Sequence, residues 1–142
     1  MKSEPKGAPL MKTKTCYKLL EIIKKSKSFL IVSHINPEGD AIGSTLALAL
    51  GLKKIGKKDI CVLNRDGVPE ILKFLPSSKL VRQKAPAKTY DLLVIVDCNS
   101  MERTGFKELK AKNTIIIDHH VLTADEMKSG FYKSLSASFI DP

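Results

Sequence analysis

The sequence has few features of a secreted or membrane protein. Its three cysteines lie far apart and form no C-x-x-C pair, so a disulfide framework is not indicated. No apolar segment of the secretory type stands at the N-terminus. The longest apolar stretch, residues 41–52, is too short for a membrane span and is interrupted by Gly43 and Gly51. These absences predict a protein of the reducing cytoplasm with no membrane segment.

Acidic residues are scarce relative to basic ones. The chain has 24 lysines and arginines against 15 aspartates and glutamates, a formal net charge of +9. Eight of the basic residues fall in the first 27 positions, and the others are scattered without a run of arginines or regular aromatic neighbours. This distribution favours a lysine-rich solvated surface. It is also compatible with an anionic substrate.

Apolar runs that alternate with helical patterns predict an α/β fold. Four short apolar runs are expected to be strands: residues 29–32, 59–63, 91–96 and 114–117. Four segments are expected to be helices: residues 16–26, 40–55, 69–75 and 101–110, the last one broken at Gly105. Because the strands are apolar throughout, we expect a parallel sheet of at least four strands with helices on both faces.

The N-terminal segment differs in composition from the rest of the chain. Residues 1–15 contain Pro5, Gly7 and Pro9 among lysines and are expected to be a disordered basic tail. Met11 is an alternative start. Residues 16–142 are then expected to form the domain.

Metal-competent side chains follow three of the predicted strands. They are His34 with Glu38 and Asp40 after the first strand, Asp97 after the third, and Asp118, His119 and His120 at the end of the fourth. The carboxyl ends of parallel strands lie on the same edge of a sheet, so these side chains should converge. Crowded carboxylates repel unless cations neutralise them. Carboxylates with imidazoles suit Mn²⁺ or Mg²⁺ more than a structural zinc ion, which predicts a two-metal site that binds phosphate.

Several of these residues have an ordinary explanation when taken alone. His34 is typical of a loop histidine, Asp40 of a first-turn helix residue, and Asp97 of a turn cap. The triplet of residues 118–120 is harder to explain in this way, because burying three polar groups at a strand end needs partners. Only the conjunction of the three strand ends favours a shared metal site.

The motifs resemble those of the DHH phosphoesterases. Residues 33–44 (SHINPEGDAIGS) resemble the first motif of that family, residues 94–97 (VIVD) the second, and residues 118–120 the triplet that names it. The resemblance runs from about residue 19 to the C-terminus and is greatest to the nanoRNase/pAp phosphatase type, which has a RecJ-like catalytic domain. It implies Mn²⁺-dependent hydrolysis of short oligonucleotides from an end, and removal of the 3′-phosphate of pAp.

The resemblance also implies a role for each motif residue. His34, Glu38 and Asp97 would hold one metal ion, while Asp40, Asp97 and His119 would hold a second, so that Asp97 is shared. His120 would face the substrate phosphate, and Asp118 would orient the neighbouring imidazoles; both are implied to be catalytic. The helix start near Gly43 and Ser44 would offer backbone N–H groups to the phosphate.

Two departures from the family pattern bear on activity. Glu38 stands where the family usually has aspartate, and its extra methylene displaces the carboxylate. The chain also stops at Pro142, before the family's fourth motif, which supplies a further shared aspartate, and before the DHH-associated domain; Asp141 would be a poor substitute. We therefore expect a truncated domain with an open sheet edge, which needs the missing C-terminal part or a homo-oligomer for stability.

Three functions remain open from the sequence. The first is an incomplete Mn²⁺-dependent phosphoesterase that acts on short oligonucleotides or nucleotide phosphates. The second is a degenerate domain that binds a nucleotide or a metal without turnover. The third is the same chemistry on pyrophosphate, polyphosphate or cyclic dinucleotides, on which related members of the family act.

Overall fold

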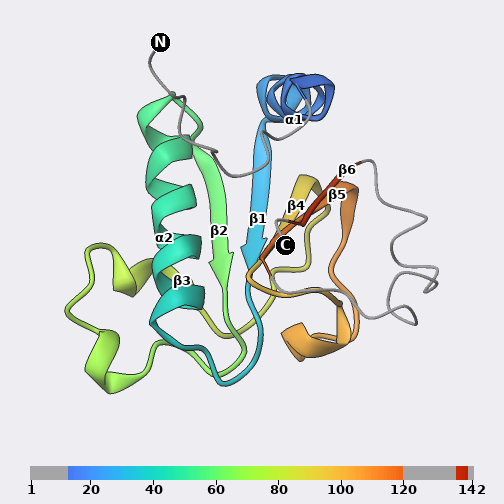
Figure 1. Cartoon of the computed structure of the whole chain (residues 1–142). Helices are drawn as coiled ribbons and strands as arrows, with labels where there is room; N and C mark the ends of the chain where they lie inside the picture. Colours follow the sequence, from blue (N-terminus) through green and yellow to red (C-terminus); the bar gives the residue numbers. More distant parts are fainter. Residues whose placement is uncertain (1–12, 120–136, 141–142) are drawn as a thin grey trace, which may run out of the picture.

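A six-stranded sheet forms the centre of the molecule (Figure 1). The computed structural model describes residues 13–119 and 137–140. Within them the strand order is β3-β2-β1-β4-β5-β6, and every neighbouring pair is parallel. The strands are Ser28–Val32 (β1), Asp59–Leu63 (β2), Val81–Arg82 (β3), Tyr90–Val96 (β4), Ala111–Asp118 (β5) and Ala137–Ile140 (β6). The predicted α/β class with a parallel sheet is confirmed.

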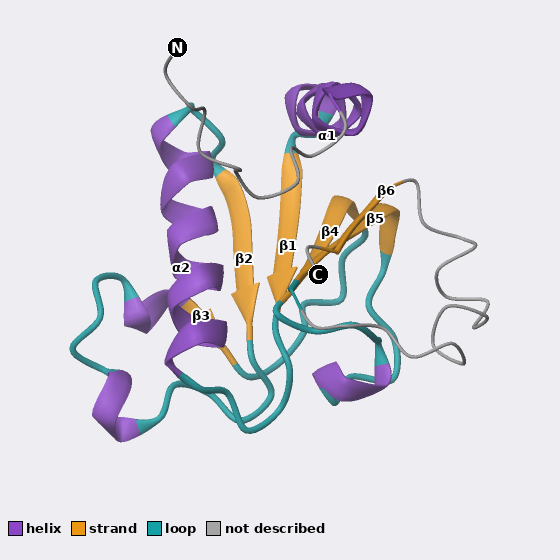
Figure 2. Ribbon diagram, viewed as in Figure 1, coloured by secondary structure: helices purple, strands orange, loops and turns teal. Residues whose placement is uncertain are grey.

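Both faces of the central strands are buried, which explains why their sequences are apolar from Phe29 to Val32 in β1 and from Leu92 to Val96 in β4. One face, which includes Phe29 and Ile31, packs against the helices α1 (Thr13–Lys25) and α2 (Gly39–Lys54). The opposite face, which includes Leu30, packs against the segment 101–111, where the 3₁₀-helix η3 (Glu102–Thr104) lies. Figure 2 shows α2 lying along β2. The α-helices of the described residues thus cover one face, and η3 with its flanking residues covers the other.

The helices differ from expectation in extent. Helix α1 begins at Thr13, so residues 13–15 belong to it and not to the predicted tail, while residues 1–12 lie outside the described residues. The helix predicted at residues 69–75 is one 3₁₀ turn, η1 (Glu70–Leu72), and a second turn, η2 (Ser78–Leu80), follows. No helix in the described part of the chain is long and apolar enough to cross a membrane.

The helix predicted at residues 101–110 is also wrong beyond its first turn. It consists of η3 alone, because Gly105 ends it with a φ of 76°, in the left-handed region. A single 3₁₀ turn is a typical connector between longer elements. Three residues are too few to form a stable α-helix.

Two strands were not predicted from the sequence. β3 has only two residues, and β6 follows the polar stretch after β5. β6 pairs with β5 from Ile115 opposite Ala137 to Asp118 opposite Ile140. The expectation that residues 114–117 form an open edge of the sheet is therefore wrong.

Gly105 should not tolerate a side chain. A Cβ atom there would lie 2.5 Å from Arg65 Cδ and 2.6 Å from Ile35 Cγ2, in a backbone conformation that L-residues avoid. We expect Gly105→Ala to lower the free energy of unfolding by about 1–3 kcal/mol in urea titrations. Gly51→Ala is the matched control, because a Cβ at Gly51 meets nothing within 4 Å and Gly51 lies within α2, in its last turn. It should raise stability by about 0.5–1 kcal/mol, and equal losses in both variants would contradict the assignment.

An ion-pair network fixes the amino ends of the strands. The Asp91 carboxylate accepts the Lys112 ammonium at 2.8 Å and the backbone N–H groups of Lys27 and Ser28 at 2.8 and 3.3 Å. Lys112 and these N–H groups lower the pKa of Asp91 to about 2.

Because the pKa of Asp91 is lower in the folded state than in the unfolded state, its contribution to stability is present above pH ~4 and is lost as the pH falls towards ~2. We expect Asp91→Asn to flatten the dependence of the urea midpoint on pH in this window. The exposed Glu108 has no ion pair among the described residues, so Glu108→Gln is the control and should keep the wild-type slope. An unchanged slope in Asp91→Asn would reject the network as a source of acid sensitivity.

Candidate metal centre

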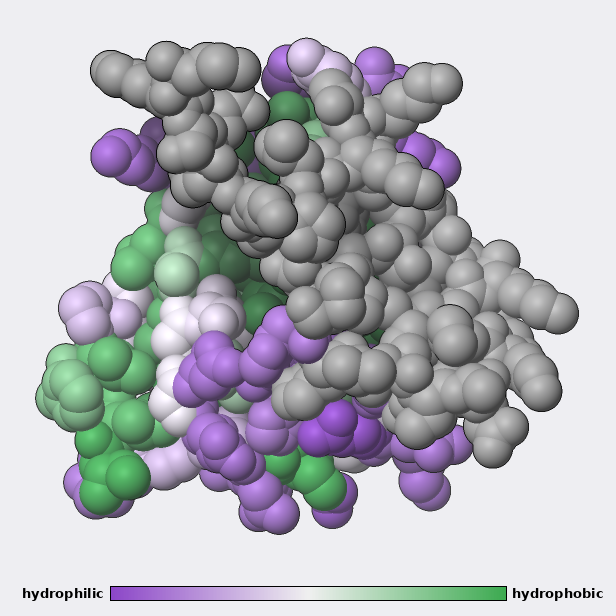
Figure 3. Space-filling model, in the orientation of Figure 1, coloured by the Kyte–Doolittle hydropathy of each residue, from purple (hydrophilic) through white to green (hydrophobic). Residues whose placement is uncertain are grey.

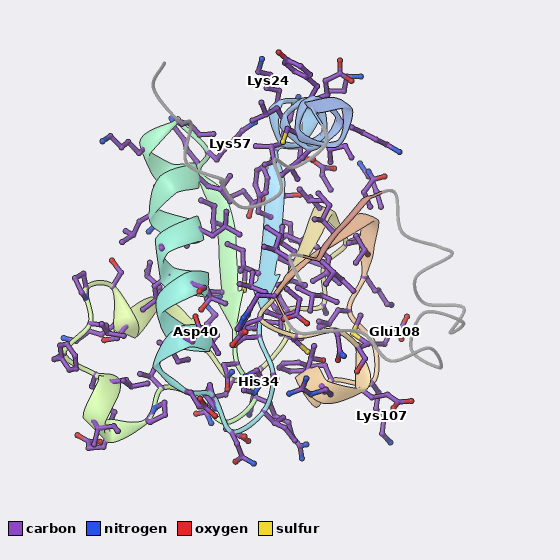
Figure 4. The ribbon with its side chains drawn as sticks, viewed as in Figure 1. Lys24, His34, Asp40, Lys57, Lys107 and Glu108 are labelled. Atoms are coloured by element: carbon purple, nitrogen blue, oxygen red, sulfur yellow. The ribbon has the colours of Figure 1, made fainter. Side chains whose placement is uncertain are left out.

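The ends of β1, β4 and β5 meet at one edge of the sheet. These three strands are adjacent in the order β1-β4-β5, and the order of connections reverses between β1 and β4. Ligand sites of open α/β sheets lie at the carboxyl ends of the strands at such a point. His34 and Asp40 are labelled at this lower end of the molecule in Figure 4. The predicted convergence of distant segments is thus present in the fold.

Three of the predicted residues form a compact group. His119 Nε2 lies 3.0 Å from Asp97 Oδ1 and 3.2 Å from Asp40 Oδ2. One ligand atom from each of the three residues lies within 4.8 Å of the other two, close enough to hold one metal ion. Two carboxylate oxygens that converge on one imidazole nitrogen concentrate negative charge, which a divalent cation neutralises. The donor set of oxygen and nitrogen suits Mn²⁺ or Mg²⁺.

His34 approaches the same aspartate from the other side. Its Nε2 lies 3.6 Å from Asp97 Oδ2, while its Nδ1 lies 2.6 Å from the carbonyl oxygen of Ile35. A carbonyl oxygen only accepts hydrogen bonds, so Nδ1 donates this one, and Nε2 is the ring nitrogen that faces Asp97. In metal-binding histidines, the ring nitrogen that does not face the metal typically donates such a hydrogen bond, which fixes the tautomer and the ring orientation.

Asp97 occupies an unusual backbone conformation. Its φ is 54°, in the left-handed region that non-glycine residues rarely adopt. Its N–H donates to the Ile117 carbonyl at 2.9 Å, which continues the β4–β5 pairing one residue past β4. Strained residues of this kind cluster at functional sites, where the surrounding structure holds them. The turn aims the carboxylate along the edge of the sheet between the two histidines.

The group has a buried side and an open side. The side chains of Asp97 and His34 are 8% and 12% exposed, while those of Asp40 and His119 are 58% and 62% exposed. A ligand that enters from solvent therefore meets Asp40 and His119 first. The buried Cys98 next to Asp97 adds no thiolate, because burial raises the pKa of its thiol.

The remaining predicted residues are placed in different ways. Asp118 is buried, and its Oδ1 accepts the backbone N–H of His119 at 2.9 Å. This hydrogen bond holds the backbone of His119. Glu38 is exposed at the N-cap of α2 and lies outside the three-residue group. Ser44 Oγ donates to Asp40 Oδ1 at 3.4 Å, and a Cβ on Gly43 would meet nothing within 4 Å. His120 lies outside the described residues.

A polar network behind the site was not predicted. Asn64, buried after β2, donates from Nδ2 to Ser33 Oγ and to the His34 carbonyl, both at 2.9 Å. Asp66 Oδ2 in turn accepts the N–H of Asn36 at 2.7 Å, and Asn36 has a φ of 49°. These bonds hold the loop that carries His34. The sequence Asn-Arg-Asp-Gly at residues 64–67 is typical of a turn, but it does not indicate these contacts.

Comparison with known proteins places the sequence in a family. Residues 28–136 match the DHH family, N-terminal domain. The chain belongs to the DHH family. The resemblance of the three motifs predicted this membership, which is confirmed.

The DHH relatives are longer than this chain. Over 95 residues the chain is 35% identical to the bifunctional oligoribonuclease and PAP phosphatase NrnA of Thermus thermophilus. The aligned region covers 63% of this chain and 27% of NrnA. The crystal structure of an exopolyphosphatase-related protein from Bacteroides fragilis superposes with a TM-score of 0.74 at 21% identity. The superposition covers 96% of this chain and 41% of the Bacteroides fragilis protein, and it supports the shared fold.

We expect the Asn64 network to be measurable as stability. Asn64→Ala removes two buried hydrogen bonds and leaves Ser33 Oγ and the His34 carbonyl without that donor. It should lower the free energy of unfolding by about 1–3 kcal/mol in urea titrations. Gln83→Ala is the control: its exposed amide donates to the Arg65 carbonyl at 3.2 Å, and its loss should cost less than about 0.5 kcal/mol. Similar losses for both variants would count against a special role of Asn64.

Proposed function

We propose that this chain is a Mn²⁺-dependent phosphoesterase that hydrolyses short oligoribonucleotides and the 3′-phosphate of pAp. The observation that carries the proposal is the position of Asp97, whose two carboxylate oxygens face His119 at 3.0 Å and His34 at 3.6 Å. Membership of the DHH family supports a metal-dependent phosphoesterase. The similarity to NrnA of Thermus thermophilus supports the choice of substrate.

Two metal ions would share Asp97. We assign one ion to Asp40, Asp97 and His119, whose ligand atoms already lie within 4.8 Å of one another. The other is assigned to Asp97 and His34, with Glu38 as a third ligand by family resemblance. Mg²⁺ would suit the same oxygen and nitrogen donors. When bound, the two ions supply charge neutralisation at the phosphate and a nucleophile near neutral pH.

The remaining residues are assigned to positioning and phosphate binding. Asp118 holds the backbone of His119 through the bond at 2.9 Å, so it keeps the imidazole in place. His120 would contact the substrate phosphate. Gly43 and Ser44 would line the same phosphate site from the second turn of α2, past the free N–H groups of its first turn, and a Cβ on Gly43 would meet nothing within 4 Å.

The chain spans 27% of the NrnA protein that it matches, so the activity of the whole enzyme is also a proposal. We propose that the chain from α1 (Thr13–Lys25) onward forms the DHH domain without its fourth motif. A cytoplasmic location stays a prediction.

Metal binding tests the ligand assignment. We expect Mn²⁺ titrations followed by electron paramagnetic resonance to show binding that Asp97→Asn weakens by more than about tenfold, because both ions lose a charged ligand. Asp59→Asn is the matched control, since Asp59 pairs with Lys88 at the start of β2, away from the site. Binding that is absent, or equal in Asp97→Asn and Asp59→Asn, would reject the assignment.

Turnover tests the substrate. We expect the chain with Mn²⁺ to release nucleoside monophosphates from di- to pentaribonucleotides and phosphate from pAp, as measured by chromatography. Hydrolysis of pyrophosphate or cyclic di-AMP alone would reject the nanoRNase assignment in favour of the same chemistry on another substrate. Tight Mn²⁺ binding without turnover of any of these compounds would indicate a binding domain.

A further inference from the structure

The connection between β2 and β3 exposes two large apolar side chains. Ile71 is 81% exposed and Phe74 is 79% exposed, the highest values among the large exposed apolar residues of the described chain. Both lie in or just after η1. Figure 3 shows apolar surface at the lower left of the molecule, over this connection. Single exposed apolar side chains are common, but neighbouring large ones indicate a binding surface.

This surface is next to the start of α2. A Cβ on Gly39 would lie 3.8 Å from Leu72 Cδ2, so η1 packs against the residue that precedes Asp40. With ~3.8 Å between successive Cα atoms, the Cα atoms of Phe74 and Asp40 are at most about 20 Å apart. A short oligonucleotide spans such a distance.

The same connection is positively charged. Residues 70–84 contain four basic residues (Lys73, Lys79, Arg82 and Lys84) and one acidic residue, Glu70, which gives 4 − 1 = +3. Lys73 is paired with Glu70 at 2.5 Å. Within the described residues, the structure gives no carboxylate partner to the other three. An exposed aromatic ring among unpaired basic side chains is the pattern of a surface that binds single-stranded nucleic acid.

We propose that Phe74, supported by Ile71, stacks a base of the oligonucleotide whose phosphate is bound at the metal centre. This inference rests on the proposed function, because it places the substrate of that site. Stacking is tolerant of sequence, since every base has an aromatic face, so it would favour oligonucleotides without selecting a particular base. Two exposed side chains offer less area than a stable protein interface, which buries about 800 Å² on each partner.

The experiment measures binding apart from turnover. A fluorescein-labelled tetraadenylate and a base-free ribose phosphate of the same length are titrated by fluorescence anisotropy, with Ca²⁺ in place of Mn²⁺ and at fixed salt. We expect Phe74→Ala to weaken binding of the tetraadenylate by about tenfold and to leave the base-free probe unchanged. Phe74→Tyr, which keeps the ring, should restore binding.

Tyr17 provides the matched control, because it is an aromatic residue that is 65% exposed on α1, away from the carboxyl edge of the sheet. Tyr17→Ala should bind both probes as the wild type does. The proposal is overturned if the wild type does not bind the tetraadenylate, if Phe74→Ala weakens both probes equally, or if it converts a dimer into a monomer in light scattering. Failure of the proposed phosphoesterase function would appear separately, as absent turnover with Mn²⁺.

Discussion

The position of the Asp97 carboxylate depends on the parallel order of three strands. β4 lies between β1 and β5, so the residues that follow its two neighbours reach Asp97 from opposite sides. His34 Nε2 lies 3.6 Å from one carboxylate oxygen and His119 Nε2 lies 3.0 Å from the other. An antiparallel strand in this place would move one imidazole to the far edge of the sheet. The direction of the three strands therefore brings His34, Asp97 and His119 together in the fold itself, without a bound ligand.

The long strands could be predicted because they are buried on both faces. β2 has the expected bounds, and β1 and β4 each begin one residue earlier than expected. β5 begins three residues earlier, since Lys112 and Asn113 at its start are exposed and polar, which hides the strand from a search for apolar runs. The convergence of His34, Asp97 and His119 follows from parallel strands alone.

The contacts between loops could not be predicted in the same way. Asn64 belongs to a turn sequence, and its Oδ1 accepts the Asp66 N–H at 3.0 Å as turn chemistry implies. Nothing local indicates that its Nδ2 reaches the loop after β1, 30 residues away. β3 is similar, because a strand of two residues has no periodicity and forms only beside β2. Such features depend on tertiary packing that a single sequence does not display.

The chain as a whole and its candidate metal centre differ in the sign of their charge. The net charge is +9 with histidines counted as neutral, yet Asp40 and Asp97 face one imidazole, and Asp118 is buried one residue away. Surface lysines attract a phosphate within the screening length of about 8–10 Å, but at contact distance the carboxylates repel it. Divalent cations reverse that local charge. On the proposed function, metal binding would therefore precede phosphate binding, and the lysine surplus would act on encounter more than on the bound state.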